Sequence, residues 1–179
     1  MPPSPRYREL TRLPEAELER LMTAAKAPAV EAIHGWEWRG YNTRWVCSLI
    51  GIRKFIKGFF KNAEGGIEGY NIPPRQNAFE GEWLHKPSPE SPKRFGFYLV
   101  GPVRPESVDS IYPDALLLDY GASPRNASWQ VERLLRDYVV QPDASNDDIL
   151  LGKAYLALGP RVPAGFFVIE RLRRSDWRP

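Results

Sequence analysis

The chain has few of the residues that build disulfides, metal centres and catalytic triads. Its 179 residues include one cysteine and two histidines. A single cysteine excludes an internal disulfide and a zinc site made of several thiolates. Cys47 stands in an apolar run, and we interpret it as a small buried hydrophobic residue. His34 and His85 have no neighbours that indicate a triad or a second metal ligand, so we expect no metal and no cofactor.

Long apolar runs and a large excess of one charge are also missing. No stretch approaches the roughly 20 apolar residues of a membrane span, and the first residues contain no apolar segment typical of a secretory signal. We therefore expect a cytoplasmic protein with no membrane partner. The formal net charge is only +3, from 25 Lys and Arg against 22 Asp and Glu. A field of that size argues against nucleic acid as a partner.

Proline and glycine are plentiful, with 18 and 14 residues spread along the chain. Many turns suit short strands better than long helices. The first part of the chain is the exception. Pro14 fits a first helical position, and apolar residues then recur at helical spacing from Leu18 to Ala25. We predict an amphipathic helix that ends before Pro28.

The periodicity changes at residues 35–40. Trp36 and Trp38 are two residues apart and share one face of an extended strand, with a glycine at each end of the stretch. No helices alternate with the strand-like runs that follow, which disfavours a parallel α/β fold. We predict a mainly β protein, an antiparallel up-and-down barrel of about 8–10 strands, with a tail and amphipathic helix at 1–34 and the barrel at 35–179 in one domain. The other strand-like runs are 45–60, 67–72, 82–85, 94–100, 115–120, 134–141, 149–158 and 166–172.

The two ends of the barrel region resemble the lipocalin-like, or calycin, barrels. In that pattern a first-strand tryptophan closes one end of the barrel, and a basic side chain from the last strand covers its ring. The resemblance implies Trp36 or Trp38 as the ring and Arg171 or Arg173 as the cation. The opening is also similar to that of small bacterial proteins of unassigned function with a Gly-x-Trp-x-Gly motif. This chain departs from that motif, because Trp36 stands where the motif has glycine.

Polar residues on otherwise apolar strands mark candidate pocket positions. Asp119 follows three leucines, and Lys153 shares a strand face with Tyr155 beside the small residues Gly152 and Ala154. Each has two interpretations, because a polar side chain near a strand end can orient a ligand or can simply face water or hold a turn. The candidate ligand-binding residues are Tyr70, Asn71, Arg75, Tyr98, Asp119, Tyr138, Lys153 and Tyr155.

These observations favour the binding of a small, largely apolar molecule inside the barrel. One alternative is a cofactor-independent isomerase or cyclase that uses the same cavity, with Asp119, Tyr138, Lys153 and Tyr155 as acid–base candidates. Another is a surface module that binds protein or nucleic acid through the basic and aromatic stretch at 53–61. For that stretch we expect an amphipathic strand whose lysines face water.

Overall fold

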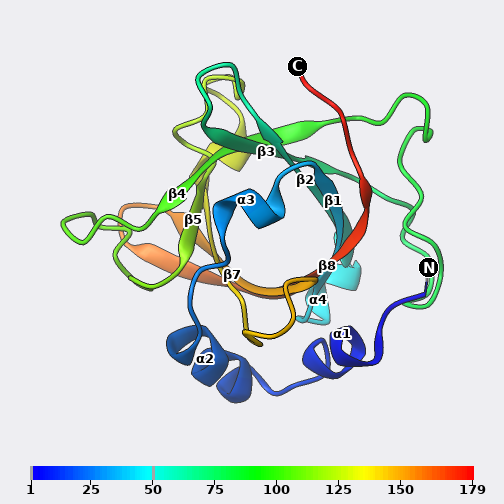
Figure 1. Cartoon of the computed structure of the whole chain (residues 1–179), viewed down its shortest axis with the longest axis horizontal. Coiled ribbons are helices and arrows are strands. Elements are labelled where there is room, and N and C mark those ends of the chain that lie inside the picture. The colour runs from blue at the N-terminus through cyan, green and yellow to red at the C-terminus, as the bar shows by residue number, and fades with distance from the viewer. Residues whose placement is uncertain (1, 50) are drawn as a thin grey trace.

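The computed structural model describes residues 2–49 and 51–179. Within them, eight antiparallel strands form a closed barrel in which each strand pairs with the next and the last returns to the first (Figure 1). The predicted mainly β, up-and-down barrel is therefore confirmed. The strands are β1 (Trp36–Asn42), β2 (Lys54–Lys61), β3 (Ile67–Ile72), β4 (Phe95–Pro102), β5 (Leu116–Asp119), β6 (Leu135–Val140), β7 (Ile149–Ala157) and β8 (Arg161–Arg174).

Short helices surround this barrel, and their positions follow from local sequence signals. The Ser4 hydroxyl accepts a hydrogen bond from the Tyr7 backbone N–H and caps α1 (Pro5–Leu10). The predicted amphipathic helix is α2 (Glu15–Ala24), which begins after Pro14. Figure 1 shows α1 and α2 outside the ring of strands, where α1 contacts β8 and α2 contacts β7. The other helical segments are α3 (Val30–Ile33), α4 (Val46–Leu49) and the 3-10 helix η1 (Val131–Leu134).

Two predicted strands differ from the structure. The run 45–60 is not one strand, because α4 occupies its first part and β2 begins only at Lys54. Gly51 between them has a φ of +70°, a left-handed conformation that breaks an extended chain. Residue 50 of that run lies outside the described residues. The run 82–85 is not a strand either, since its pairing is an isolated bridge between His85 and Pro74.

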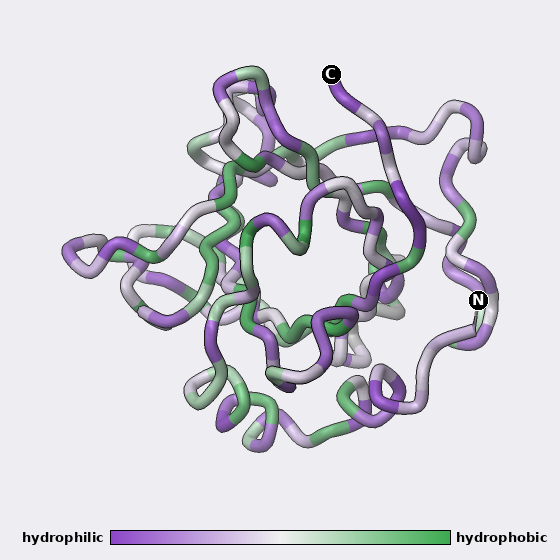
Figure 2. The backbone as a smooth tube through the Cα atoms, in the orientation of Figure 1, coloured by the Kyte–Doolittle hydropathy of each residue, from purple (hydrophilic) through white to green (hydrophobic). Residues whose placement is uncertain are grey.

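Strand alternation divides the buried side chains into two cores. One fills the barrel and includes Trp38, Phe59, Tyr98 and Phe167. The other covers the outer wall, where helices and loops pack against outward-facing strand residues such as Tyr138. Figure 2 shows hydrophobic segments both along the barrel wall and on the helices that lie against it. Both faces of many strands are therefore buried, which matters for locating the site.

One end of the barrel is closed by α3, which Figure 1 shows within the ring of strands. The Trp38 indole N–H donates to the Ile33 carbonyl over 3.2 Å, and Arg171 Nη2 donates to the Ala32 carbonyl over 2.8 Å. The Arg171 guanidinium also lies 5.3 Å from the Trp38 ring centroid and 5.1 Å from that of Trp36. These contacts satisfy carbonyls of a helix too short to bond its own ends. None of the helices among the described residues combines the length and apolar character needed to cross a membrane.

A buried carboxylate ties the loop between β3 and β4 to the outer face of β1. Glu37 is 2% exposed and lies 2.8 Å from His85 Nε2 and 3.2 Å from Arg173 Nε. The Tyr70 hydroxyl donates to its other oxygen over 3.3 Å. Burial alone would raise the Glu37 pKa, but His85 and Arg173 together outweigh it and the pKa lies below its usual value.

A glutamate whose folded-state pKa is lowered contributes stability above its unfolded pKa of about 4.3, and that stability is lost as the pH falls through the folded value. We expect Glu37→Gln to lower the free energy of unfolding by about 1–3 kcal/mol at pH 7. Its unfolding free energy should also fall less than that of the parent between pH 5 and about 3. Urea unfolding at several pH values measures both. Glu64→Gln in the exposed β2–β3 turn is the control, and equal acid sensitivity of parent and Glu37→Gln would contradict the assignment.

Candidate functional site

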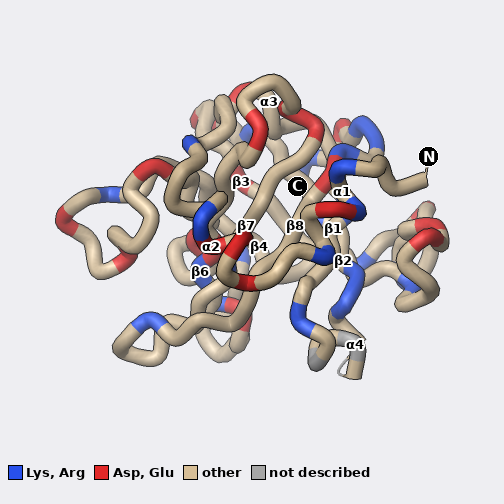
Figure 3. The backbone as a smooth tube through the Cα atoms, turned by 90° about the horizontal axis from the view of Figure 1, so that it is seen from below, with Lys and Arg blue, Asp and Glu red and all other residues tan. Residues whose placement is uncertain are grey.

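The end of the barrel opposite α3 contains a pocket. The connections β1–β2, β3–β4, β5–β6 and β7–β8 all lie at this end, because successive strands run antiparallel. Figure 3 shows α3 and α4 at opposite ends of the molecule, with α4 in the β1–β2 connection. The pocket has a volume of about 440 Å³, within the range that small-molecule sites occupy.

Aromatic and aliphatic side chains form the walls of the pocket. Phe55 on β2 and Phe167 on β8 meet edge to face, with 5.6 Å between ring centroids. Both rings lie directly against the barrel wall, because their strand neighbours are Gly40 and Gly152. A Cβ atom at either glycine would come within 2.1 Å of the ring. Because these glycines have no side chains, the two rings can pack against the wall, and the centre of the pocket stays open. Other apolar lining residues are Ile52, Phe95, Val131, Leu135 and Ala154.

Four polar side chains form the floor of the pocket: Lys57, Asn71, Tyr120 and Asp137. Lys57 is 2% exposed and Asp137 4% exposed. The Lys57 ammonium donates to Asp137 Oδ2 over 2.9 Å, to the Tyr120 hydroxyl over 2.5 Å and to Asn71 Oδ1 over 3.2 Å. Because they come from β2, β3, β6 and the residue after β5, only the closed barrel brings them together.

The electrostatics of this floor follow from burial around one ion pair. Burial lowers the Lys57 pKa, and the Asp137 carboxylate counteracts that change. Burial raises the Tyr120 pKa well above its usual value, and Asp137 raises it further. Tyr120 therefore keeps its proton and donates it to Asp137 Oδ2 over 2.9 Å. The Lys57 ammonium also lies 4.7 Å from the Tyr98 ring centroid, which adds a cation–π contact.

Of the eight residues that the sequence analysis proposed for ligand binding, Asn71 lines this pocket. Tyr98 lies deeper in the barrel, where its hydroxyl donates to the Gly58 carbonyl over 3.1 Å and its ring packs 4.9 Å from that of Tyr120. Arg75 is exposed on the β3–β4 connection. Tyr70 is on the outer wall with Glu37. Of these four residues, Asn71 is therefore the one that lines the pocket.

Tyr138, Lys153 and Tyr155 lie on the outer wall of the barrel. The Tyr138 hydroxyl donates to the Asp109 carbonyl over 2.9 Å. Lys153 donates to Glu19 of α2 over 2.5 Å, and α2 covers this part of the wall. Tyr155 belongs to the outer core with Tyr138. These side chains point away from the pocket, because strand neighbours alternate and Asp137 and Ala154 point into it.

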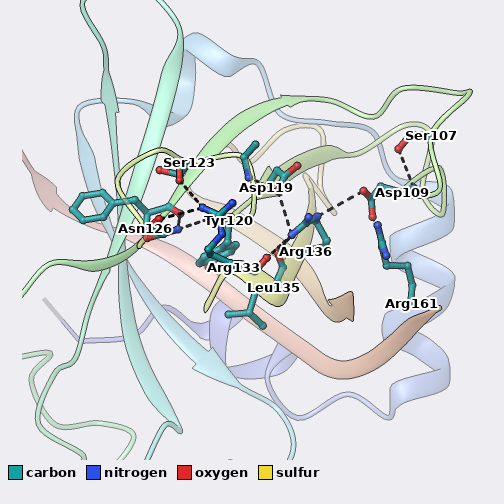
Figure 4. Close-up of polar contacts among 12 residues, drawn as sticks. Ser107, Asp109, Asp119, Tyr120, Ser123, Asn126, Arg133, Leu135, Arg136 and Arg161 are labelled. Carbon is teal, nitrogen blue, oxygen red and sulfur yellow. Dashed lines mark hydrogen bonds and ion pairs between the residues drawn. The ribbon is translucent and has the colours of Figure 1, made fainter. Parts of the chain in front are cut away.

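Asp119 belongs to a cluster of charged side chains at the same outer wall (Figure 4). Its carboxylate lies 3.2 Å from Arg136 Nη1, and Arg136 Nε lies 3.6 Å from Asp109. Arg161 pairs with Asp109 as well. The Asp119 carboxylate also accepts from the Ala122 backbone N–H over 3.0 Å and so holds the turn after β5. Of the two interpretations of Asp119, its contacts match the turn-holding one.

The expectation that the lysines at 53–61 face water is wrong for Lys54 and Lys57, each of which is 2% exposed. Lys54 is turned outward but covered, and it donates to the Gly81 carbonyl over 2.8 Å while lying 3.5 Å from the Trp83 ring centroid. Lys57 points inward. The alternation of side chains along a strand could have predicted this, because Phe55 and Phe59 lie two residues before and after Lys57 on the same face and belong to the inner core.

Among the described residues, His, Cys, Asp and Glu form no group of three or more that could hold a metal ion. The arrangement at the open end can instead surround an apolar molecule and present buried polar atoms to one end of it. Comparison of the chain with models of protein families, with curated proteins and with solved structures found no match.

Proposed function

We propose that the protein binds a small, largely apolar molecule in the open end of its barrel. The observation that carries this proposal is the pocket of about 440 Å³ with aromatic walls and a buried polar floor. Apolar walls supply most of the affinity of such a site, and a few fixed polar groups orient the ligand. The Lys57–Asp137 pair supports this reading, because a buried ion pair is costly to keep inside a barrel that apolar residues could fill.

The barrel also supports the comparison with lipocalin-like, calycin-type proteins. The tryptophan of that pattern corresponds to Trp38 on the first strand, and the basic residue to Arg171 on the last. Arg173, the other candidate, pairs with Glu37 instead. We propose on these contacts that Trp36, Trp38 and Arg171 close one end of the barrel while the ligand occupies the other.

No observation favours the two alternatives. The acid–base candidates for an isomerase or cyclase lie on the outer wall, as Tyr138 and Lys153 illustrate. A nucleic-acid surface at 53–61 would need several exposed cations, but Lys54 and Lys57 are buried and Arg53 is only partly exposed, which leaves Lys61. Figure 3 shows basic and acidic segments alternating around the molecule.

The test is a titration with pyrene, a neutral aromatic probe whose fluorescence reports its surroundings. We expect saturable binding of one probe per chain at micromolar concentration. Gly152→Ala should weaken it about tenfold, because the added methyl pushes the Phe167 ring into the space the probe needs. Gly101→Ala is the matched control, since a Cβ atom there meets nothing within 4 Å. Absence of saturable binding to the parent, or equal binding to both variants, would contradict the proposal.

A further inference from the structure

The hydrogen-bonding capacity of the pocket floor is almost fully used. An ammonium group has three N–H donors, and Lys57 directs its donors to Asn71 Oδ1, the Tyr120 hydroxyl and Asp137 Oδ2. Lys57 therefore has no donor left for a ligand. A ligand carboxylate or ketone would find no N–H from this residue.

The hydrogen-bonding groups of the two neutral floor residues, Tyr120 and Asn71, are also occupied. The Tyr120 hydroxyl accepts from Lys57 and from Asn71 Nδ2 and gives its one proton to Asp137. The Asn71 amide directs its second donor to the Gly96 carbonyl over 2.9 Å. At the entrance, Gln76 makes hydrogen bonds to the backbone N–H and carbonyl of Lys54. These groups hold one another and offer a ligand little.

Asp137 is the exception. Both of its hydrogen bonds reach Oδ2, and Oδ1 accepts from none of the described residues. Asp137 Oδ1 is not fully buried, and Asp137 lines the pocket, so we place this oxygen at the pocket surface. The open position on the floor is therefore a hydrogen-bond acceptor with negative charge.

We infer that the ligand carries a neutral hydrogen-bond donor, such as a hydroxyl group, that binds Asp137 Oδ1 while its apolar body lies between Phe55 and Phe167. This inference rests on the proposed function. A carboxylate is disfavoured, because Lys57 has no N–H left to donate to it and its oxygens would face the Asp137 Oδ1 acceptor. An ammonium group is disfavoured too, because it would add an uncompensated third charge beside a pair that is already neutral. An ether or ketone offers only an acceptor.

The experiment compares four probes that share the pyrene ring system on the unmodified chain: 1-pyrenemethanol, its methyl ether, 1-pyrenecarboxylate and pyrene. We expect the alcohol to bind about tenfold more tightly than the ether, because a hydrogen bond to a charged acceptor favours it. The carboxylate should bind more weakly than the ether. Fluorescence titration at pH 7 and moderate salt measures all four dissociation constants.

The outcomes separate this inference from the proposed function. Equal affinities for alcohol, ether and pyrene, or tightest binding of the carboxylate, would overturn the donor inference and leave apolar binding intact. Failure of every probe to bind would overturn both. Asp137→Asn adds a second arm. Lys57 and Tyr120 need its amide oxygen, so its NH₂ group should face the pocket and reverse the preference toward the ether. If this variant does not fold, the four-probe comparison on the unmodified chain still decides the inference.

Discussion

Asp137→Leu is expected to lower the free energy of unfolding by about 3–5 kcal/mol, because it leaves the Lys57 ammonium buried without its counter-charge. Lys57 and Asp137 side chains are 3% and 5% exposed, so little water reaches the Lys57 ammonium to replace the lost partner. Tyr120 also loses the acceptor of its hydroxyl proton. Chemical denaturation at pH 7 measures the loss.

The double variant Lys57→Met, Asp137→Leu is the matched control. Replacing both members of a buried ion pair with apolar residues of similar volume is often neutral or stabilising, so most of the loss should be recovered. The double variant should also bind pyrene but no longer prefer the alcohol probe. A loss below about 1 kcal/mol in Asp137→Leu, the size found for exposed pairs, would show that the pair is open to water.

Trp38→Ala is expected to cost about 3–5 kcal/mol, the range for truncating a large buried aromatic side chain. Trp38 is fully buried inside the barrel, where it packs edge to face on Phe59 with 6.4 Å between ring centroids. Its loss removes the hydrogen bond to the Ile33 carbonyl and the ring beneath Arg171. The closed end of the barrel then loses the side chain that joins α3 to β1.

Trp129→Ala is the control for this second prediction, because Trp129 is 80% exposed. Removing an exposed side chain should change the free energy of unfolding by no more than about 0.5 kcal/mol. Adding Arg171→Ala to Trp38→Ala should then cost less than Arg171→Ala costs alone, since the shared cation–π contact is already gone. Additive losses in the double variant would show that Arg171 acts without Trp38.

The fold could be predicted because its signals are local. The tryptophan-containing stretch at 35–40, the recurring turns and the absence of helices between strands all indicate an antiparallel meander. The structure confirms that barrel with β1 starting at Trp36. The two wrong strand predictions are 45–60 and 82–85, both of which have a composition that favours strands. Gly51 interrupts the first with a left-handed conformation, and the second lies in a proline-containing loop.

The site could be predicted only in part, because polar residues on apolar strands occur on both faces of this barrel. Tyr138 and Lys153 looked like pocket residues, yet helices and loops cover the outer wall and hold them there. Asp137, one residue before Tyr138, faces the pocket instead. A shift of one position exchanges the two faces of a strand. A strand that is buried on both sides has no alternation of polar and apolar residues that would show which face is inside.

By itself, the sequence determined that strands form, that successive strands pair and that aromatic residues recur on alternate positions, since each depends on residues near one another in the chain. Tertiary structure alone decided which face became the interior and which four polar residues met there. Lys57 and Asp137 are 80 residues apart, and their pairing follows from closure of the barrel and from the helices that cover its outer wall. These are long-range packing interactions, and no local sequence pattern indicates them.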